Sequence, residues 1–213
     1  MNKIGIETLI VGQLKTNCYL VYNQEEKDCF IIDPGDDAGF IINKIKDLDL
    51  QPRAVVCTHG HFDHLLAVTE LKLAFDIPFY LHSADLPILK RGQSTAEYFL
   101  GCSVDKPVMP DVFLDQEQSL KAEGLELKVF FTPGHTQGSS SFLIDSQEVV
   151  FVGDLLFAGG SYGRTDLQGG SLIELKKSLK KILALPGKTV IYPGHDQKTT
   201  VIQERKFYHR LLR

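Results

Sequence analysis

The segment THGHFDH at residues 58–64 is the feature of this sequence that most restricts its fold. Directly before it, residues 54–57 form the apolar run AVVC, which is typical of a fully buried strand, and residues 65–75 have a helical pattern. The segment is therefore predicted to lie on a turn at the carboxyl end of a strand. Open α/β sheets place their ligands at such turns.

Four side chains within this segment can bind metal ions. His59 and His61 are two residues apart, and on an extended segment this spacing points both imidazoles to the same side. Asp63 and His64 follow at the start of the predicted helix and can face the same pocket. Because one zinc or iron ion cannot easily take all four ligands from a single loop, the segment favours two adjacent metal ions. The alternative is a polar loop that caps the helix.

Three later residues occur in the same setting, on a polar turn with glycine just after an apolar strand. They are His135 in FTPGHT, Asp154 in FVGD and His195 in YPGH. One such residue is usually a turn or capping residue, but three repetitions of one arrangement favour metal ligands. The sequence thus contains seven candidate ligands.

Strand and helix patterns alternate along the chain and predict one globular domain over residues 1–213. Strands are predicted over residues 4–11, 17–22, 28–33, 54–57, 79–82, 125–131, 140–144, 149–152 and 189–192. Helices are predicted from Asp36 or Asp37 to Leu48, over 65–75, over 172–185 and from about residue 199 to the end. Residues 83–112 are less regular and indicate a helical insertion that faces the substrate.

Charge and composition narrow the possible partners. Lys and Arg number 23 and Asp and Glu 27, so the formal net charge is 23 − 27 = −4, and no nucleic-acid partner is expected. The sequence has no apolar run long enough to span a membrane and no signal-peptide pattern, so we expect a soluble cytoplasmic protein without a membrane partner. The four cysteines form no CxxC pair, which favours buried thiols over two disulfides.

Four motifs together resemble those of a known family. THGHFDH, TPGHTQGS, VGDLLF and YPGH occur in the order and spacing found in the metallo-β-lactamase superfamily. Within it, the sequence is similar to the glyoxalase II, or hydroxyacylglutathione hydrolase, branch in its short bacterial form. The resemblance covers most of the chain and implies a four-layer αββα sandwich of the α+β class, with two mixed β-sheets face to face and helices outside.

The same resemblance assigns roles to the seven candidate ligands. It implies two divalent metal ions per chain, with zinc expected first and iron or manganese as alternatives. One ion would be held by His59, His61 and His135, and the other by Asp63, His64 and His195. Asp154 would bridge the two ions together with a hydroxide, and Asp63 and Asp154 are the carboxylates expected to have a catalytic role.

The expected reaction is hydrolysis of a small acyl thioester, such as S-lactoylglutathione, by the bridging hydroxide. A thiol with a pKa of about 8.5 leaves as a thiolate without a strong general acid, whereas a lactam nitrogen would need a proton. Antibiotic-degrading members of the superfamily are exported and generally lack a bridging carboxylate. Asp154 and the absence of a signal peptide therefore argue against that activity.

Two departures from the family pattern limit the substrate assignment. Full-length glyoxalase II has a C-terminal helical domain that contacts the glutathione carboxylate, and this chain ends 213 − 195 = 18 residues after His195. The segment SYGRTD resembles the GRTD segment of the short enzymes, and its Arg164 is our candidate for binding a substrate carboxylate. The alternative is that Arg164 pairs internally with Asp166. The second departure is Ala67, where many relatives have glycine.

Two other functions are kept as alternatives. Persulfide dioxygenases share the GRTD segment and use a single iron ion, held by the equivalents of His59, His135 and Asp154. Relatives of that kind usually have tyrosine where this chain has Gln197, which favours the hydrolase. The third hypothesis is a metal-binding protein without turnover. Oligomeric state is not predicted.

Overall fold

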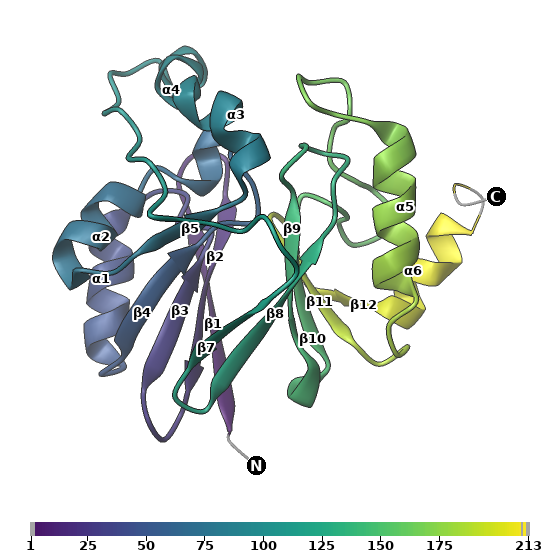
Figure 1. The fold of residues 1–213 in the computed structure, drawn as a ribbon, viewed down its shortest axis with the longest axis horizontal. Coiled ribbons are helices and arrows are strands. Elements are labelled where there is room, and N and C mark those ends of the chain that lie inside the picture. The colour runs from purple at the N-terminus through teal and green to yellow at the C-terminus, as the bar shows by residue number, and fades with distance from the viewer. Residues whose placement is uncertain (1–2, 210, 212–213) are drawn as a thin grey trace.

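The computed structural model describes residues 3–209 and 211, and it has two six-stranded sheets packed face to face with helices outside (Figure 1). The strand order is β1-β2-β3-β4-β5-β6 in the first sheet and β12-β11-β10-β9-β8-β7 in the second. Both sheets contain parallel and antiparallel pairs. The predicted αββα sandwich with two mixed sheets is confirmed.

Each half of the chain supplies one sheet and its covering helices. The first half consists of β1 Ile4–Val11, β2 Thr16–Asn23, β3 Asp28–Ile32, α1 Ala38–Asp47, β4 Gln51–Val56, a 3-10 turn Phe62–His64, α2 Val68–Phe75, β5 Phe79–Leu81, a 3-10 turn Ser83–Asp85, α3 Leu86–Lys90, α4 Gly92–Leu100 and β6 Val112–Phe113. The second half consists of β7 Ser119–Ala122, β8 Leu125–Phe131, β9 Ser140–Ile144, a 3-10 turn Asp145–Gln147, β10 Val149–Gly153, α5 Leu172–Leu183, β11 Val190–Pro193, β12 Thr199–Thr200 and α6 Val201–Tyr208.

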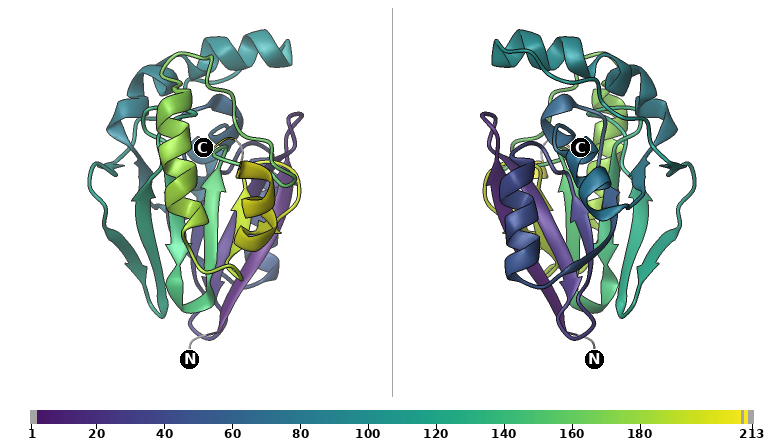
Figure 2. Two further views of the ribbon diagram at one scale, coloured as in Figure 1. Left: turned by 90° about the vertical axis from the view of Figure 1, so that its right-hand side faces the viewer. Right: turned by 90° about the vertical axis from the view of Figure 1, so that its left-hand side faces the viewer.

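Three apolar layers hold the sandwich together. Along β3, Phe30 and Ile32 point between the two sheets, while Cys29 and Ile31 point toward the helices that cover the first sheet. This alternation is the two-residue period of a strand that is buried on both faces. A third layer lies between the second sheet and its helices, and Figure 2 shows α5 and α6 on that outer face and α1 on the opposite one.

The cysteine prediction is confirmed for three of the four residues. Cys18, Cys29 and Cys57 are buried free thiols in or beside the strands of the first sheet, and Cys102 is a free thiol on the surface. No helix in the described part of the chain is both long enough and apolar enough to cross a bilayer.

Several elements differ from those predicted. α2 begins at Val68 rather than residue 65, because residues 62–64 form a separate 3-10 turn that holds the motif. Asp37 occupies the N-cap position of α1, but its carboxylate accepts a hydrogen bond from the backbone N–H of Gly12 instead of capping the helix. Strands β6, β7 and β12 were not predicted, and β12 occupies residues 199–200, where the last helix was expected to begin. The segment 83–112 contains α3 and α4, and both helices lie at one end of the sandwich (Figure 1).

That end of the sandwich is closed by hydrogen bonds between the two sheets. The Asn17 side chain donates to the carbonyl oxygens of Pro193 (3.0 Å) and Asp196 (2.8 Å), and the Ser140 backbone N–H donates to the Thr58 carbonyl (2.8 Å). These bonds fix the loop after β11 and the loop after β4 against the opposite sheet. The loops that carry the candidate ligands therefore meet at one place.

Candidate metal centre

The structure brings all seven candidate ligands together at the carboxyl ends of four strands. His59, His61, Asp63 and His64 follow β4, while His135 follows β8, Asp154 follows β10 and His195 follows β11. His59, His64 and His135 are buried and the other four are partly exposed. Four loops from two sheets thus converge on one small volume, which no single loop could build.

The first cluster consists of His59, His61 and His135, which offer ligand atoms within 4.8 Å of one another. His61 Nδ1 and His135 Nε2 are 2.9 Å apart. Their rings and that of His59 meet edge to face, with centroids separated by 4.6 to 4.8 Å. Three nitrogen donors that point at one another suit a metal ion.

Asp63, His64 and His195 form the second cluster, again within 4.8 Å. Asp63 Oδ2 lies 3.3 Å from His195 Nε2 and 3.6 Å from His64 Nε2. This cluster has two nitrogen donors and one oxygen donor. Its members come from both halves of the chain, since the loop after β4 supplies two of them and the loop after β11 supplies the third.

Asp154 lies between the clusters and faces both with different oxygens. Its Oδ2 is 3.6 Å from Nε2 of His135, in the first cluster. Its Oδ1 is 3.5 Å from Nε2 of His64 and 3.8 Å from Nε2 of His195, both in the second cluster. A carboxylate in this position can bind one ion through each oxygen.

Three of these ligand atoms are buried and have no hydrogen-bond partner in the described part of the protein. They are His59 Nε2, His64 Nε2 and Asp154 Oδ1. Leaving buried polar atoms without partners is costly, and three such atoms around one volume fit bound cations. The mixture of imidazole and carboxylate donors suits zinc, iron or manganese. The residues present therefore fit two divalent metal ions.

A buried carboxylate that the motif search missed orients two of the histidines. Asp33, at the end of β3, accepts hydrogen bonds from the backbone N–H and the hydroxyl of Thr58, both at 2.7 Å, and lies 3.1 Å from His64 Nδ1. Because the Thr58 hydroxyl donates to Asp33, it must accept from His59 Nδ1, 3.0 Å away. Both rings therefore turn Nε2 toward the centre. His135 is oriented similarly, since its Nδ1 donates to the Arg164 carbonyl at 2.8 Å.

The local charges separate the two clusters electrostatically. Burial, together with the neighbouring histidines, lowers the pKa of His59 and brings that of His61 to about 3. Burial would also lower the pKa of His64, but Asp63, Asp154 and Asp33 outweigh it and raise this pKa to about 10. Without metal, His59 and His61 are therefore neutral and His64 is protonated. A cation that binds at the second cluster must replace this proton.

Gly194 leaves the space that the carboxylate of Asp154 needs. A Cβ atom at this position would lie 2.3 Å from Asp154 Oδ1 and 2.8 Å from Cε1 of His64. The glycine of the YPGH motif is thus required by the close approach of the backbone to both clusters. Its N–H also donates to the carbonyl of Gly153 at 2.8 Å, which joins the two loops.

A second buried carboxylate that the sequence did not reveal joins two ligand loops. Asp85, from the 3-10 turn before α3, accepts hydrogen bonds from the Gly60 N–H (2.9 Å), the Thr136 hydroxyl (2.7 Å) and the Gly138 N–H (2.7 Å). Gly60 lies between His59 and His61, and Thr136 follows His135. Burial raises the pKa of Asp85, although these three donors lower it. Asp85 thus ties together the loops that form the first cluster.

A cleft of about 460 Å³ opens over the first cluster and Asp154. Its walls are mainly apolar, and Leu14, Phe62, Ile88, Phe99 and Leu167 contribute to them. Arg164 also lines the cleft, and its guanidinium makes two hydrogen bonds to Asp166, at 3.0 and 2.8 Å. Arg164 therefore lines the cleft and is also paired internally with Asp166, while its binding of a substrate carboxylate stays a prediction.

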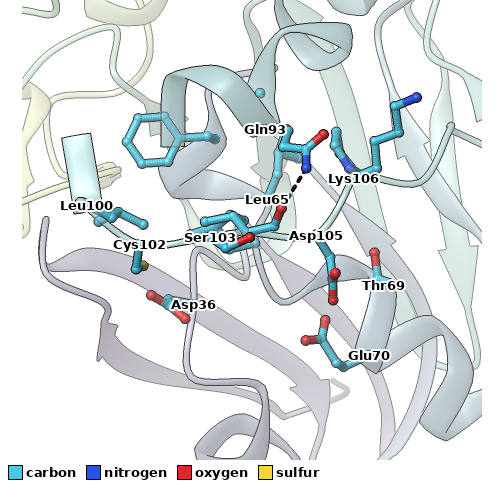
Figure 3. Close-up of a pocket in the computed structure, with 15 residues that line it drawn as sticks. Asp36, Leu65, Thr69, Glu70, Gln93, Leu100, Cys102, Ser103, Asp105 and Lys106 are labelled. Carbon is cyan, nitrogen blue, oxygen red and sulfur yellow. Dashed lines mark hydrogen bonds between the residues drawn. The ribbon is translucent and has the colours of Figure 1, made fainter. Parts of the chain in front are cut away.

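A second hollow lies on the other side of Phe62 and contains none of the seven ligands (Figure 3). It measures about 250 Å³ and lies between α2 and the connection that follows α4. Within it, the Gln93 side chain donates to the Val104 carbonyl at 2.9 Å, which holds this connection against α4. The hollow therefore borders the cleft, but none of the candidate metal ligands lines it.

The geometry agrees with what is known of similar proteins. The model of the metallo-beta-lactamase superfamily matches residues 11–195. The chain is 34% identical over 206 residues to the hydroxyacylglutathione hydrolase GloC of Haemophilus influenzae, which covers 95% of this chain and 96% of GloC. It is 36% identical over 198 residues to the probable metallo-hydrolase YqgX of Bacillus subtilis, which covers 92% of each.

Solved structures show the same fold. The B3 metallo-β-lactamase BLEG-1 superposes with a TM-score of 0.86 at 38% identity, over 95% of this chain and 97% of BLEG-1. TTHA1623, solved in a di-iron-bound form, gives 0.85 at 37% identity, over 94% and 98%. ETHE1 from Myxococcus xanthus gives 0.79 at 25% identity, over 98% of this chain and 84% of ETHE1.

Replacing Asp85 should loosen the first cluster and destabilise the fold. In Asp85→Asn, an amide NH₂ must face at least one of the three donors, so we expect the free energy of unfolding to fall by about 2–4 kcal/mol in chemical denaturation. Metal affinity should fall with it. The control is Asp115→Asn, because that side chain is 48% exposed and belongs to the same region. Equal stability of the two variants would refute the role given to Asp85.

Proposed function

Because this chain belongs to the metallo-β-lactamase superfamily, we propose that it is a metallo-hydrolase with two divalent metal ions that cleaves a small acyl thioester, in the manner of glyoxalase II. The observation that carries this proposal is the position of Asp154. One of its oxygens faces the first cluster and the other faces the second. Two complete clusters joined by one carboxylate support a dinuclear centre better than a mononuclear one.

In this proposal His59, His61 and His135 hold one ion, Asp63, His64 and His195 hold the other, and Asp154 serves both. When bound, the metal ions supply Lewis acidity, which makes water a nucleophile near neutral pH and offsets the negative charge that develops on a carbonyl oxygen. The protein contributes the fixed orientation of the ligands. Asp33 and the Arg164 carbonyl hold the imidazoles in place through their Nδ1 atoms.

The chemistry of the cleft supports a thioester over an amide or lactam. Apart from the proposed metal ligands, the polar side chains that line it are Arg91, Thr95, Arg164 and Gln168. None of these residue types serves as a general acid that could protonate a leaving amine near neutral pH. A thiol, with a pKa of about 8.5, leaves as the thiolate without such help. The GloC relative supports the same choice, since its name describes a hydrolase of hydroxyacylglutathione, which is a thioester.

A persulfide dioxygenase is the second candidate, and the likeness to ETHE1 favours it. Such an enzyme needs one iron ion with open positions for O₂ and the persulfide. The second cluster argues against it here, because Asp63, His64 and His195 are all in place and share Asp154 with the first. β-Lactam hydrolysis, suggested by the name of BLEG-1, is a further arm of the test.

Metal analysis beside activity assays tests the proposal. Protein purified without added metal should contain about two metal ions per chain and release thiol from S-lactoylglutathione. The same preparation is assayed for O₂ uptake with glutathione persulfide and for opening of a chromogenic cephalosporin. One iron ion per chain with O₂ uptake and no thiol release would establish the dioxygenase instead. Bound metal with none of the three activities would leave a metal-binding protein.

The role of Asp154 is tested by Asp154→Asn, which retains the shape of the side chain but removes its charge. Metal should be lost from at least one cluster, and thiol release should fall on the order of 100-fold or more, while the circular dichroism spectrum stays the same. Asp145→Asn is the matched control, because its side chain is 67% exposed. An Asp154→Asn protein with full metal content and full activity would exclude the bridging role.

Arg164 is proposed to bind a carboxylate of the substrate. Arg164→Gln should raise KM for a carboxylate-bearing thioester roughly three- to tenfold with little change in kcat. The paired carboxylate allows a sharper test, because Asp166 occupies the guanidinium and has a pKa lowered to about 2 by it. Asp166→Asn should lower KM by freeing Arg164. If both variants leave KM unchanged, Arg164 has only a structural role.

A further inference from the structure

We infer that Arg91 is a second anion-binding side chain of the cleft, and that the substrate's thiol carrier has a negative charge at each of its two ends. The inference rests on the proposed thioester hydrolysis but concerns a different residue from Arg164. Arg91 lies between α3 and α4, which belong to the first half of the chain, whereas Arg164 lies between β10 and α5 (Figure 1). Both line the same cleft.

The backbone of Arg91 is held firmly where the two helices meet. Its N–H donates to the carbonyl of Ile88 at 3.1 Å, and its own carbonyl accepts from the hydroxyls of Ser94 and Thr95, each at 3.0 Å. Ile88 and Thr95 line the cleft beside it. The helix junction thus fixes the backbone from which the Arg91 side chain reaches the cleft.

The guanidinium of Arg91 is free, unlike those of the other described arginines. Arg53 pairs with Asp28, Arg164 pairs with Asp166, and Arg205 donates to the carbonyls of Leu183 and Leu185. Within residues 3–209, no hydrogen bond or ion pair is made by the Arg91 side chain. An unpaired guanidinium beside an apolar wall is suited to bind a carboxylate through two parallel hydrogen bonds.

No acidic side chain that lines the cleft is available to pair with Arg91, so an anionic ligand is its fitting partner. The acidic side chains of the cleft are Asp63 and Asp154, and both already face histidines of the clusters. Apolar side chains, among them Phe62 and Leu167, also line the cleft, together with the two arginines. A thioester bound above the clusters would therefore meet apolar surface and two positive charges.

This arrangement selects a class of substrate. A short peptide thiol with two carboxylates, such as glutathione, has one carboxylate for each guanidinium, and a cleft of about 460 Å³ is in the usual size range for ligands of this kind. An uncharged carrier could use neither arginine. Coenzyme A also carries negative charge, but as phosphates on a larger molecule, so it serves as the competing arm of the test.

Equilibrium binding tests Arg91 independently of turnover. S-Methylglutathione is a stable thioether, and its dimethyl ester is the same ligand with both carboxylates masked. Calorimetry on the metal-loaded protein should show S-methylglutathione binding roughly tenfold more weakly to Arg91→Gln than to the unaltered protein. The ester should bind weakly to both. Lys90→Gln is the matched control, because it removes a charge next to Arg91 from a side chain that does not line the cleft.

The outcomes separate the role of Arg91 from the proposed reaction. Equal affinity of Arg91→Gln and the unaltered protein, or an equal loss in Lys90→Gln, overturns the inference. The inference is also overturned if coenzyme A displaces S-methylglutathione more strongly than glutathione does. If thiol is released with equal KM from the lactoyl thioesters of glutathione and N-acetylcysteamine, the reaction stands and the inference falls. If S-methylglutathione binds in an Arg91-dependent way but no thiol is released from the thioesters, the inference stands and the proposed reaction falls.

Discussion

Three hydrogen-bond donors converge on the buried carboxylate of Asp33, and the orientation of the metal centre depends on them. Two come from Thr58 and the third from His64 Nδ1. The Thr58 hydroxyl in turn accepts a hydrogen bond from His59 Nδ1 and so orients this ring. One carboxylate at the end of β3 therefore sets the direction of one imidazole in each cluster. A buried negative charge is tolerable here because every one of its strong contacts is a donor.

The candidate metal centre also depends on both sheets, because each sheet contributes loops that carry different ligands. The first sheet contributes the dense motif after β4, and the second contributes His135, Asp154 and His195. The backbone bonds from Ser140 to Thr58 and from Asn17 to Gly194 join the loops across the sandwich. The site is thus an interface between two halves as well as a pocket. Its precision depends on the packing of Phe142 and Phe30 between the sheets.

Sequence patterns were sufficient to identify the seven candidate ligands that the structure brings together, because each one follows a recognisable strand. His135, Asp154 and His195 repeat a local arrangement that requires no knowledge of the fold. Asp85 and Arg91 carry no such signal, because their importance arises only when segments far apart in the chain meet. Asp33 does follow an apolar strand, in FIIDPG, but its contacts with Thr58 and His64 arise only in the folded chain. Similarly, β6 was missed because it has only two residues, both exposed, and its pairing with β5 is a tertiary contact. The helix boundary at Val68 could not be predicted because the motif itself adopts a 3-10 turn.

The distribution of ligands along the chain also has a consequence for biosynthesis. The first cluster is complete once residue 135 has been made, but the second must wait for His195, and Asp154 comes between them. The residues of the nitrogen-only cluster are therefore all synthesised before the mixed cluster is complete. Until His195 has been made, Asp63 and His64 lack the third member of their cluster. A chain that stops before residue 195 thus contains the residues of the first cluster without all those of the second.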